Sequence, residues 1–204
     1  KMQLLYSTTS PYARKLRVII AELGLGVTFV ETVAMDNPPA LRAANPLTKV
    51  PALITGPEAH QAIFDSPVIA AYLLSLDPKQ TLLPASGDAH WQALTIEALC
   101  DGILDAAIAL RFDTAAGGTD RSPMWANRMY AAIDNAILAL PARLAAYEAV
   151  AGNGFGYAQA CAVVALEYLD FRYPGIDWRT AAPALAPFHK HWTDRPSLLT
   201  TRPA

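Results

Sequence analysis

A change in hydrophobic pattern at Asp77–Asp88 limits most strongly what this chain can fold into. Before this stretch, short apolar runs alternate with brief helical segments and turns. After it, apolar residues recur every three or four positions over long stretches, which is the spacing of one helix face. The pattern therefore predicts two architectures in one chain, an α+β unit followed by an all-helical unit.

Residues 1–77 predict the element order β-α-β-α-β-β-α. The expected strands are Gln3–Tyr6, Val27–Val33, Val50–Ile54 and Ala62–Phe64, and the expected helices are Tyr12–Leu23, Pro39–Ala44 and Pro67–Leu76. Gly24 and Gly26 end the first helix, since glycine is favoured just past a helix C-terminus. This order fits a mixed sheet with helices on its faces.

The stretch Asp77–Asp88 carries two prolines and one glycine, and we interpret residues 78–88 as a linker. Residues 89–204 then form the expected helical domain. Its expected helices are Ala89–Ala116, Met124–Val150, Tyr157–Phe171 and Trp178–Thr193, with a break at Gly117–Gly118. The segment Tyr157–Phe171 is apolar almost all the way round, which predicts a helix at the centre of a bundle.

Composition narrows the function classes. The net charge is −2 and the basic residues are scattered, which argues against nucleic acid or an anionic membrane as partner. The sequence contains no run of 18 apolar residues that would predict a membrane span. Lys1–Tyr6 is too short for a signal peptide before polar residues begin, so we expect a cytoplasmic protein, and the alternative is the processed form of a secreted one. Cys100 and Cys161 lie in apolar helical stretches and are expected to be reduced and buried. His189 and His191 point apart on a helix, so no metal site is expected.

Ser10-Pro11 opens the first expected helix directly after a strand. Ser is a favoured N-cap and Pro a favoured first helical residue, so the pair could be a helix cap and nothing more. A helix N-terminus also offers free N–H groups and partial positive charge. A thiol placed there ionises more easily, each pKa unit being about 1.4 kcal/mol, and a Ser hydroxyl can donate a hydrogen bond to the thiolate sulfur.

Two further segments have ordinary and functional interpretations. Val50–Pro51 could be a trans proline in a loop, or a cis bond that turns the backbone of Val50 toward a peptide ligand, with Lys49 near a carboxylate. Asp65 and Ser66 precede an apolar helical run and could simply cap it. Alternatively, Ser66 and its N–H could hold an anionic carboxylate while Asp65 meets a cationic amine.

The order and spacing of these three pairs, Ser10-Pro11, Val50-Pro51 and Asp65-Ser66, are more specific than each pair alone. The sequence here resembles the glutathione transferase superfamily, in its bacterial, serine-type zeta/omega-like branch. The resemblance covers nearly the whole chain and is carried by the segments SPYARKLRVIIAELGL, NPLTKVPALI, DSPVIAAYL, ALEYLDFRYPGIDW and HKHWTDRPSLLTTRP. It implies a thioredoxin-like N-terminal domain that binds glutathione and a helical domain that binds a second substrate.

The resemblance also implies a role for each site residue. Ser10 would be the catalytic residue beside the glutathione sulfur. Val50, before a cis Pro51, would pair with the cysteinyl backbone of glutathione. Asp65 and Ser66 would hold the γ-glutamyl end, and Lys49 would lie near the glycyl carboxylate. Glutathione would be the co-substrate, without a metal.

Other residues near the sulfur position stay open. Thr8 and Thr9 would exchange roles with Ser10 after a one-residue shift of the loop. Tyr6 ends the first strand and could reach the sulfur, although a strand tyrosine usually packs under the helix. Thr8, Thr9, Tyr12 and Arg111 are the candidates for the second-substrate pocket. Arg111 could equally be a solvated cation at a helix end.

One departure from the family pattern concerns the central helix. The family carries a Ser/Thr-x-x-Asp capping box at the start of that helix, and we place its two positions at Tyr157 and Ala160. Neither residue can form the reciprocal cap, so the box is expected to be absent. A missing cap typically costs about 1 kcal/mol, which would concern the stability of the helix rather than the site.

The resemblance implies a homodimeric detoxification enzyme that directs the glutathione thiolate at a small hydrophobic electrophile. Because Ser replaces the Cys of the omega-like pattern, a mixed disulfide at residue 10 is disfavoured, which argues against a thiol–disulfide reductase. The alternatives are a non-catalytic transferase-like binding module, or a glutathione-dependent isomerase, dehalogenase or peroxidase.

Overall fold

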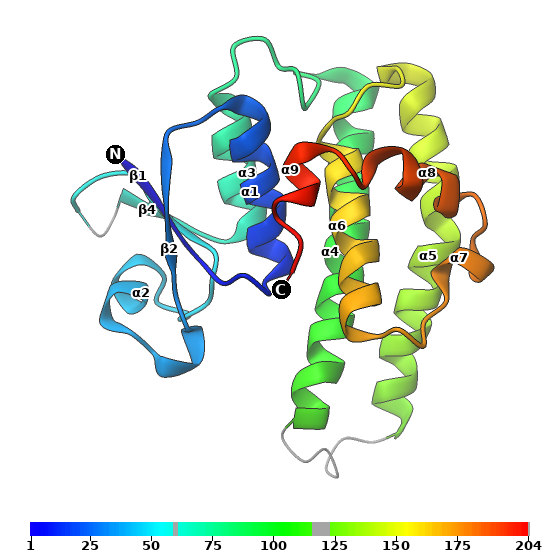
Figure 1. Ribbon diagram of the computed structural model, residues 1–204, viewed down its shortest axis with the longest axis horizontal. Coiled ribbons are helices and arrows are strands. Elements are labelled where there is room, and N and C mark those ends of the chain that lie inside the picture. Colours follow the sequence, from blue (N-terminus) through cyan, green and yellow to red (C-terminus); the bar gives the residue numbers. More distant parts are fainter. Residues whose placement is uncertain (59–60, 116–122, 204) are drawn as a thin grey trace. The chain divides into compact units, whose positions relative to one another are not determined.

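A computed structural model describes residues 1–58, 61–115 and 123–203 (Figure 1). The chain divides into two compact units. The first unit comprises Lys1–Leu82 together with Arg195–Ala204, and the second comprises Leu83–Asp194. The end of the sequence therefore belongs to the same unit as its beginning, whereas the domain boundaries drawn from the sequence assigned it to the helical half.

The first unit is built on a four-stranded sheet within its described residues. The strands are β1 (Met2–Tyr6), β2 (Val27–Glu31), β3 (Ala52–Ile54) and β4 (Ala62–Ile63), in the order β2-β1-β3-β4. β1 pairs with β2 in parallel and with β3 antiparallel, and β3 pairs antiparallel with β4. The mixed sheet predicted from the sequence is therefore confirmed, with β2 and β3 each shorter than expected by two residues.

Helices cover both faces of this sheet. The described helices of this unit are α1 (Pro11–Leu23), the 3₁₀ turn η1 (Ala34–Asp36), α2 (Pro39–Ala44), α3 (Ser66–Ser75) and α9 (Pro196–Leu199). Adjacent residues of β1 point to opposite faces, so Leu5 packs with Leu41 of α2 while the buried Leu4 faces the other side. α1 packs against α3 and also against α9, as Figure 1 shows.

The described residues of the second unit form helices joined by short loops, with no strand among them. Its helices are α4 (Gly87–Ala115), α5 (Pro123–Ala151), α6 (Tyr157–Arg172), α7 (Trp178–Ala181) and α8 (Leu185–Trp192). Residues 157–169 of α6 are all buried, which confirms α6 as the central helix of the bundle. The break expected at Gly117–Gly118 lies outside the described residues. None of the helices in the described ranges is both long and apolar enough to cross a membrane.

The expected helix Trp178–Thr193 was wrong, because it is two helices, α7 and α8, separated by a turn. Pro183 explains the interruption. The residue before a proline is pushed out of helical geometry, and Ala182 has φ −134° and ψ 77°. The short helix α9 was not expected, since Arg195-Pro196 was interpreted only as the end of the preceding helix.

The capping positions of α6 were also placed wrongly, by one residue. The N-cap is Gly156 and the third helical residue is Gln159, not Tyr157 and Ala160. The Gln159 Oε1 accepts a hydrogen bond of 3.0 Å from the Gly156 N–H, which is one half of a capping box. Glycine has no side chain to supply the other half. The buried Tyr157 instead donates to Glu97 of α4, and burial raises the pKa of Tyr157 well above its ordinary value.

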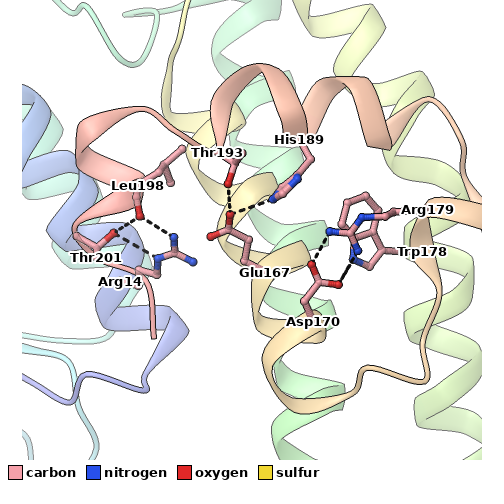
Figure 2. Close-up of polar contacts among 9 residues, drawn as sticks. All are labelled: Arg14, Glu167, Asp170, Trp178, Arg179, His189, Thr193, Leu198 and Thr201. Carbon is pink, nitrogen blue, oxygen red and sulfur yellow. Dashed lines mark hydrogen bonds and ion pairs between the residues drawn. The ribbon is translucent and has the colours of Figure 1, made fainter. Parts of the chain in front are cut away.

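Two carboxylates of α6 hold the helices that follow it (Figure 2). Glu167 lies 2.9 Å from the His189 Nε2 and accepts a 2.6 Å hydrogen bond from the Thr193 hydroxyl. Asp170 accepts from the Trp178 indole at 2.8 Å and from both nitrogens of the Arg179 fork at 2.8 Å. Cys100 and Cys161 are buried thiols that are not joined in a disulfide, as expected.

Candidate functional site

Strand register brings three loops of the first unit to one end of the sheet. Leu5 of β1 lies opposite Ala52 of β3, so the residues after β1 face the residues before β3. Leu53 of β3 lies opposite Ile63 of β4, so the residues after β4 reach the same end. Residues 7–10, 48–51 and 64–66 are therefore neighbours at this end, although they are widely separated in sequence.

Ser10 is the N-cap of α1. Its Oγ accepts a 3.2 Å hydrogen bond from the Ala13 N–H, and Pro11 occupies the first helical position. In that bond the hydroxyl is an acceptor, so its proton takes no part in the cap. A serine hydroxyl can thus cap the helix and still donate a hydrogen bond to a ligand at the helix N-terminus.

The rival hydroxyls have different surroundings. The Thr9 Oγ1 lies 3.2 Å from the Ser7 Oγ, within the turn that joins β1 to α1. The Tyr6 ring packs edge-on against Phe29, with centroids 5.7 Å apart, and the Arg17 guanidinium lies 5.0 Å from the Tyr6 ring centroid. Burial lowers the pKa of Arg17, partly offset by Tyr6 and Glu31. Tyr6 therefore contributes its ring to the packing of α1 and β2.

The Val50–Pro51 peptide bond is cis, as the resemblance implies. The loop before it is organised by Asn45, a buried residue that the sequence analysis left without a role. The Asn45 amide donates to the Lys49 C=O at 2.9 Å and accepts from the Leu47 N–H at 3.0 Å. The Asn45-Pro46 pair is a turn signal that could have identified this residue.

Asp65 and Ser66 lie at the N-terminus of α3. Asp65 is the N-cap residue but its side chain makes no capping hydrogen bond, and it is exposed. Ser66 is the first helical residue and is buried. The Asp65 carboxylate therefore faces solvent at the end of the sheet that carries Ser10, where a cationic group could approach it.

Comparison with known proteins decides the family. Residues 4–81 match the glutathione S-transferase N-terminal domain, and residues 123–191 match the glutathione S-transferase C-terminal domain. The uncharacterized GST-like protein YibF of Escherichia coli (strain K12) is 30% identical over 204 residues, covering 99% of this chain and 98% of YibF. The chain belongs to the glutathione S-transferase superfamily.

Solved transferase structures share the fold over nearly the whole of this chain. A glutathione transferase family member from Pseudomonas fluorescens Pf-5, solved with bound glutathione, is 33% identical with a TM-score of 0.85 and full coverage of both chains. A glutathione S-transferase from Methylobacterium radiotolerans, solved with glutathione sulfonate, is 32% identical with a TM-score of 0.89, covering 99% of this chain and 94% of that one. The α+β domain followed by a helical domain is thus the transferase fold.

The residues expected around a second substrate fall in both units of this chain. Thr8, Thr9 and Tyr12 are half-buried in the first unit, and Arg111 is exposed near the end of α4 in the second. The second-substrate pocket stays a prediction. Across the described ranges, no group of three or more His, Cys, Asp or Glu side chains could hold a metal ion.

Asn45 supplies the first testable prediction for the first unit. Asn45→Ala removes both side-chain hydrogen bonds of the loop before Pro51, and we expect a loss of about 1–3 kcal/mol in unfolding free energy together with weaker glutathione binding. Denaturant unfolding and calorimetry would measure the two effects. Asn45→Asp is the matched variant, since it keeps the acceptor for Leu47 but loses the donor to Lys49. Equal glutathione affinity in all three proteins would contradict a role for this loop.

Proposed function

We propose that this protein is a serine-type glutathione transferase of the zeta/omega-like branch, with Ser10 as the catalytic residue. The observation that carries the proposal is the Ser10 cap, in which the Oγ accepts from Ala13 while the hydroxyl proton takes no part. This arrangement provides a hydrogen-bond donor at a helix N-terminus, beside the loops that precede β3 and follow β4. A thiolate sulfur is the ligand group that such a donor and such a dipole stabilise.

The proposed mechanism has two steps, ionisation of the glutathione thiol and attack of the sulfur on the electrophile. The glutathione thiol gives up its proton to solvent, and the Ser10 hydroxyl with the α1 N-terminus stabilises the thiolate that remains. The sulfur then forms a bond to an electrophilic carbon, and the electron pair leaves with a departing group or enters a conjugated acceptor. Lowering the thiol pKa by one unit is about 1.4 kcal/mol of preference for the reactive form.

The other site residues match the charges of glutathione, which has two carboxylates and one ammonium. In this proposal the Val50 backbone pairs with the cysteinyl residue next to the cis Pro51. Asp65 meets the γ-glutamyl ammonium, Ser66 its carboxylate, and Lys49 the glycyl carboxylate. The exposed Asp65 carboxylate and the position of Ser66 at the N-terminus of α3 support this division.

The second substrate is a small hydrophobic electrophile held by Thr8, Thr9, Tyr12 and Arg111. Residues 1–77 bind glutathione and residues 78–88 are the linker. Residues 89–204 are the second-substrate domain, to whose pocket Thr8, Thr9 and Tyr12 of the first domain contribute. The segment after Asp194 groups with the first unit by its contacts. The active form is a cytoplasmic homodimer with a detoxification role. Light scattering of the purified protein would measure its mass in solution, and a monomer would contradict the dimer.

Glutathione binding followed by calorimetry tests the proposal as a whole. We expect binding of glutathione and of S-methylglutathione, together with conjugation of an activated aryl halide. S-methylglutathione lacks the thiol proton, so it separates recognition of the peptide from activation of the sulfur. Binding of neither peptide would contradict the proposed function and favour a non-catalytic module of the same fold.

Asp65 gives a sharper test of how the peptide is recognised. Asp65→Asn should weaken glutathione binding about tenfold, since it removes a charge-assisted hydrogen bond of about 1.4 kcal/mol. Cysteinylglycine lacks the γ-glutamyl group, so it should bind more weakly than glutathione. Its affinity should be the same for Asp65→Asn and for the unmodified protein. Asp36→Asn removes an exposed carboxylate from η1 of the same unit and is the charge-matched control. An equal loss in both variants would point to net charge instead of Asp65.

A further inference from the structure

The C-terminal segment, residues 195–203, is attached to α1 by polar contacts at two points. The first point is Glu22, near the end of α1. Arg195 binds the Glu22 carboxylate through Nε and Nη2, both at 2.7 Å, and the Ser197 hydroxyl donates to the same carboxylate. Burial raises the pKa of Glu22, but the hydrogen bonds from Arg195 and Ser197 outweigh it and the pKa lies below its ordinary value.

The second point is Arg14, in the first turn of α1 (Figure 2). Its guanidinium is buried, with only 2% of the residue exposed. Nη2 donates to the Leu198 C=O at 2.9 Å, and Nε donates to the Thr201 hydroxyl at 3.3 Å. Thr201 in turn donates to the Ser197 C=O at 2.7 Å, which fixes the hydroxyl that Arg14 reaches. The Arg14 side chain thereby contacts both helix α9, at Leu198, and the residues that follow α9, at Thr201.

Arg14 and Ser10 belong to the same turn of helix. The Arg14 N–H donates to the Ser10 C=O at 3.0 Å, and the Ala13 N–H donates to the Ser10 Oγ. A displacement of Arg14 therefore moves the residues that hold Ser10 in place. Glu22 is eight residues further along, about 12 Å at 1.5 Å per residue. Of these two contacts, the one at Glu22 fixes the far end of α1, and the one at Arg14 fixes the end that carries the cap.

We propose that Arg14 is a positioning residue, through which the C-terminal segment holds the first turn of α1, and with it the Ser10 hydroxyl, in the place needed to stabilise the glutathione thiolate. The proposal rests on the role of Ser10 in the proposed function. Arg14 acts through the helix and not on the substrate. Its planar fork suits the task, because two donors in fixed directions set both the distance and the rotation of the helix relative to the segment.

Variants of Thr201 test this contact without touching Ser10. Thr201→Val removes the acceptor of the Arg14 Nε, Thr201→Ser keeps it, and Thr200→Val is the control, since Thr200 is exposed and its hydroxyl donates only to Pro196. We expect Thr201→Val to lower kcat about tenfold at neutral pH and to raise the pKa of the bound thiol by about one unit, with glutathione affinity unchanged within about twofold. Thr201→Ser should restore both values.

Glu22→Gln distinguishes positioning from general stability. It weakens the same segment at the far end of α1, so it should lower the unfolding midpoint while the thiol pKa stays at its original value. Ultraviolet titration of the thiolate in the glutathione complex would measure the pKa. The proposal is overturned if Glu22→Gln or Thr200→Val shifts the thiol pKa as far as Thr201→Val, or if Thr201→Val shifts it not at all.

A measurement on the ligand-free protein keeps this proposal separate from the proposed function. Amide hydrogen exchange at Ala13 and Arg14, followed by NMR, should be at least several-fold faster in Thr201→Val than in Thr200→Val. If the protein fails to bind glutathione, the transferase proposal falls, and exchange still decides whether the segment holds this turn. Equal exchange in the two variants would overturn the positioning role.

Discussion

Ser10→Ala should lower the turnover of glutathione conjugation about 100-fold while changing glutathione affinity by no more than about twofold. The reason is that removing a single hydrogen-bond donor to an anionic reacting group lowers kcat about 10²–10³-fold. The peptide would still be held by Lys49, Val50 and Asp65, so binding survives. Steady-state kinetics with calorimetry on the same preparations would measure both quantities.

Two matched variants separate the hydroxyl from the helix cap. Ser10→Gly removes the hydroxyl but costs the cap only a few tenths of a kcal/mol, whereas Ser10→Ala costs the cap about 1 kcal/mol. Both should lose turnover equally if the hydroxyl is the cause. Ser10→Thr keeps a hydroxyl and should retain most of the activity. Full activity in Ser10→Gly, with loss in Thr9→Val or Tyr6→Phe, would transfer the role to that residue.

Trp178→Ala should destabilise the second unit by about 3–5 kcal/mol, the range for removing a fully buried large side chain. Trp178 is 0% exposed, donates to Asp170 and packs against the His189 ring at 5.5 Å between centroids. Trp178→Phe keeps much of the ring but loses the indole donor, so its cost should be smaller. Denaturant unfolding, followed by circular dichroism, would measure these differences.

The control for this prediction is Val150→Ala, which shortens an apolar side chain of α5 that is 54% exposed. A change within about 0.5 kcal/mol is expected there, because little area is buried. Trp178 lies in the second unit. At a low temperature, at which the Trp178→Ala variant is folded, its affinity for glutathione should therefore equal that of the unmodified protein. A cost below 1 kcal/mol would show that the contacts of Trp178 with Asp170 and His189 are dispensable.

Local pattern was sufficient for most of the fold. Glycines after α1, the apolar periodicity of α4 and the all-round apolar face of α6 are signals that act over a few residues, and these elements formed where they were expected. The expected helix Trp178–Thr193 failed because its apolar period continues through Pro183, and proline geometry overrides the period. Helix α9 is a single turn stabilised by contacts with α1, which local pattern cannot reveal.

The residues of the candidate site also fall into those that local sequence predicts and those that it does not. Ser10, Pro51 and Ser66 carry short motifs at element boundaries, and the sequence predicts their position because caps and prolines mark such boundaries. Asn45 was missed although its turn signal is local, since its role depends on burial. Arg14 could not be assigned, because its partners Leu198 and Thr201 are 184 and 187 residues away.

The grouping of the C-terminal segment with β1 and α1 has a consequence for the order of events during protein synthesis. Residues 1–82 leave the ribosome before residues 195–201 and contain the four described strands, yet Arg14 and Glu22 acquire these partners only when residues 195–201 have emerged. The intervening helical unit must be made in the meantime. We therefore expect the nascent first half to assemble its sheet early, and the helix end that bears Ser10 to be fixed only after residues 195–201 have emerged.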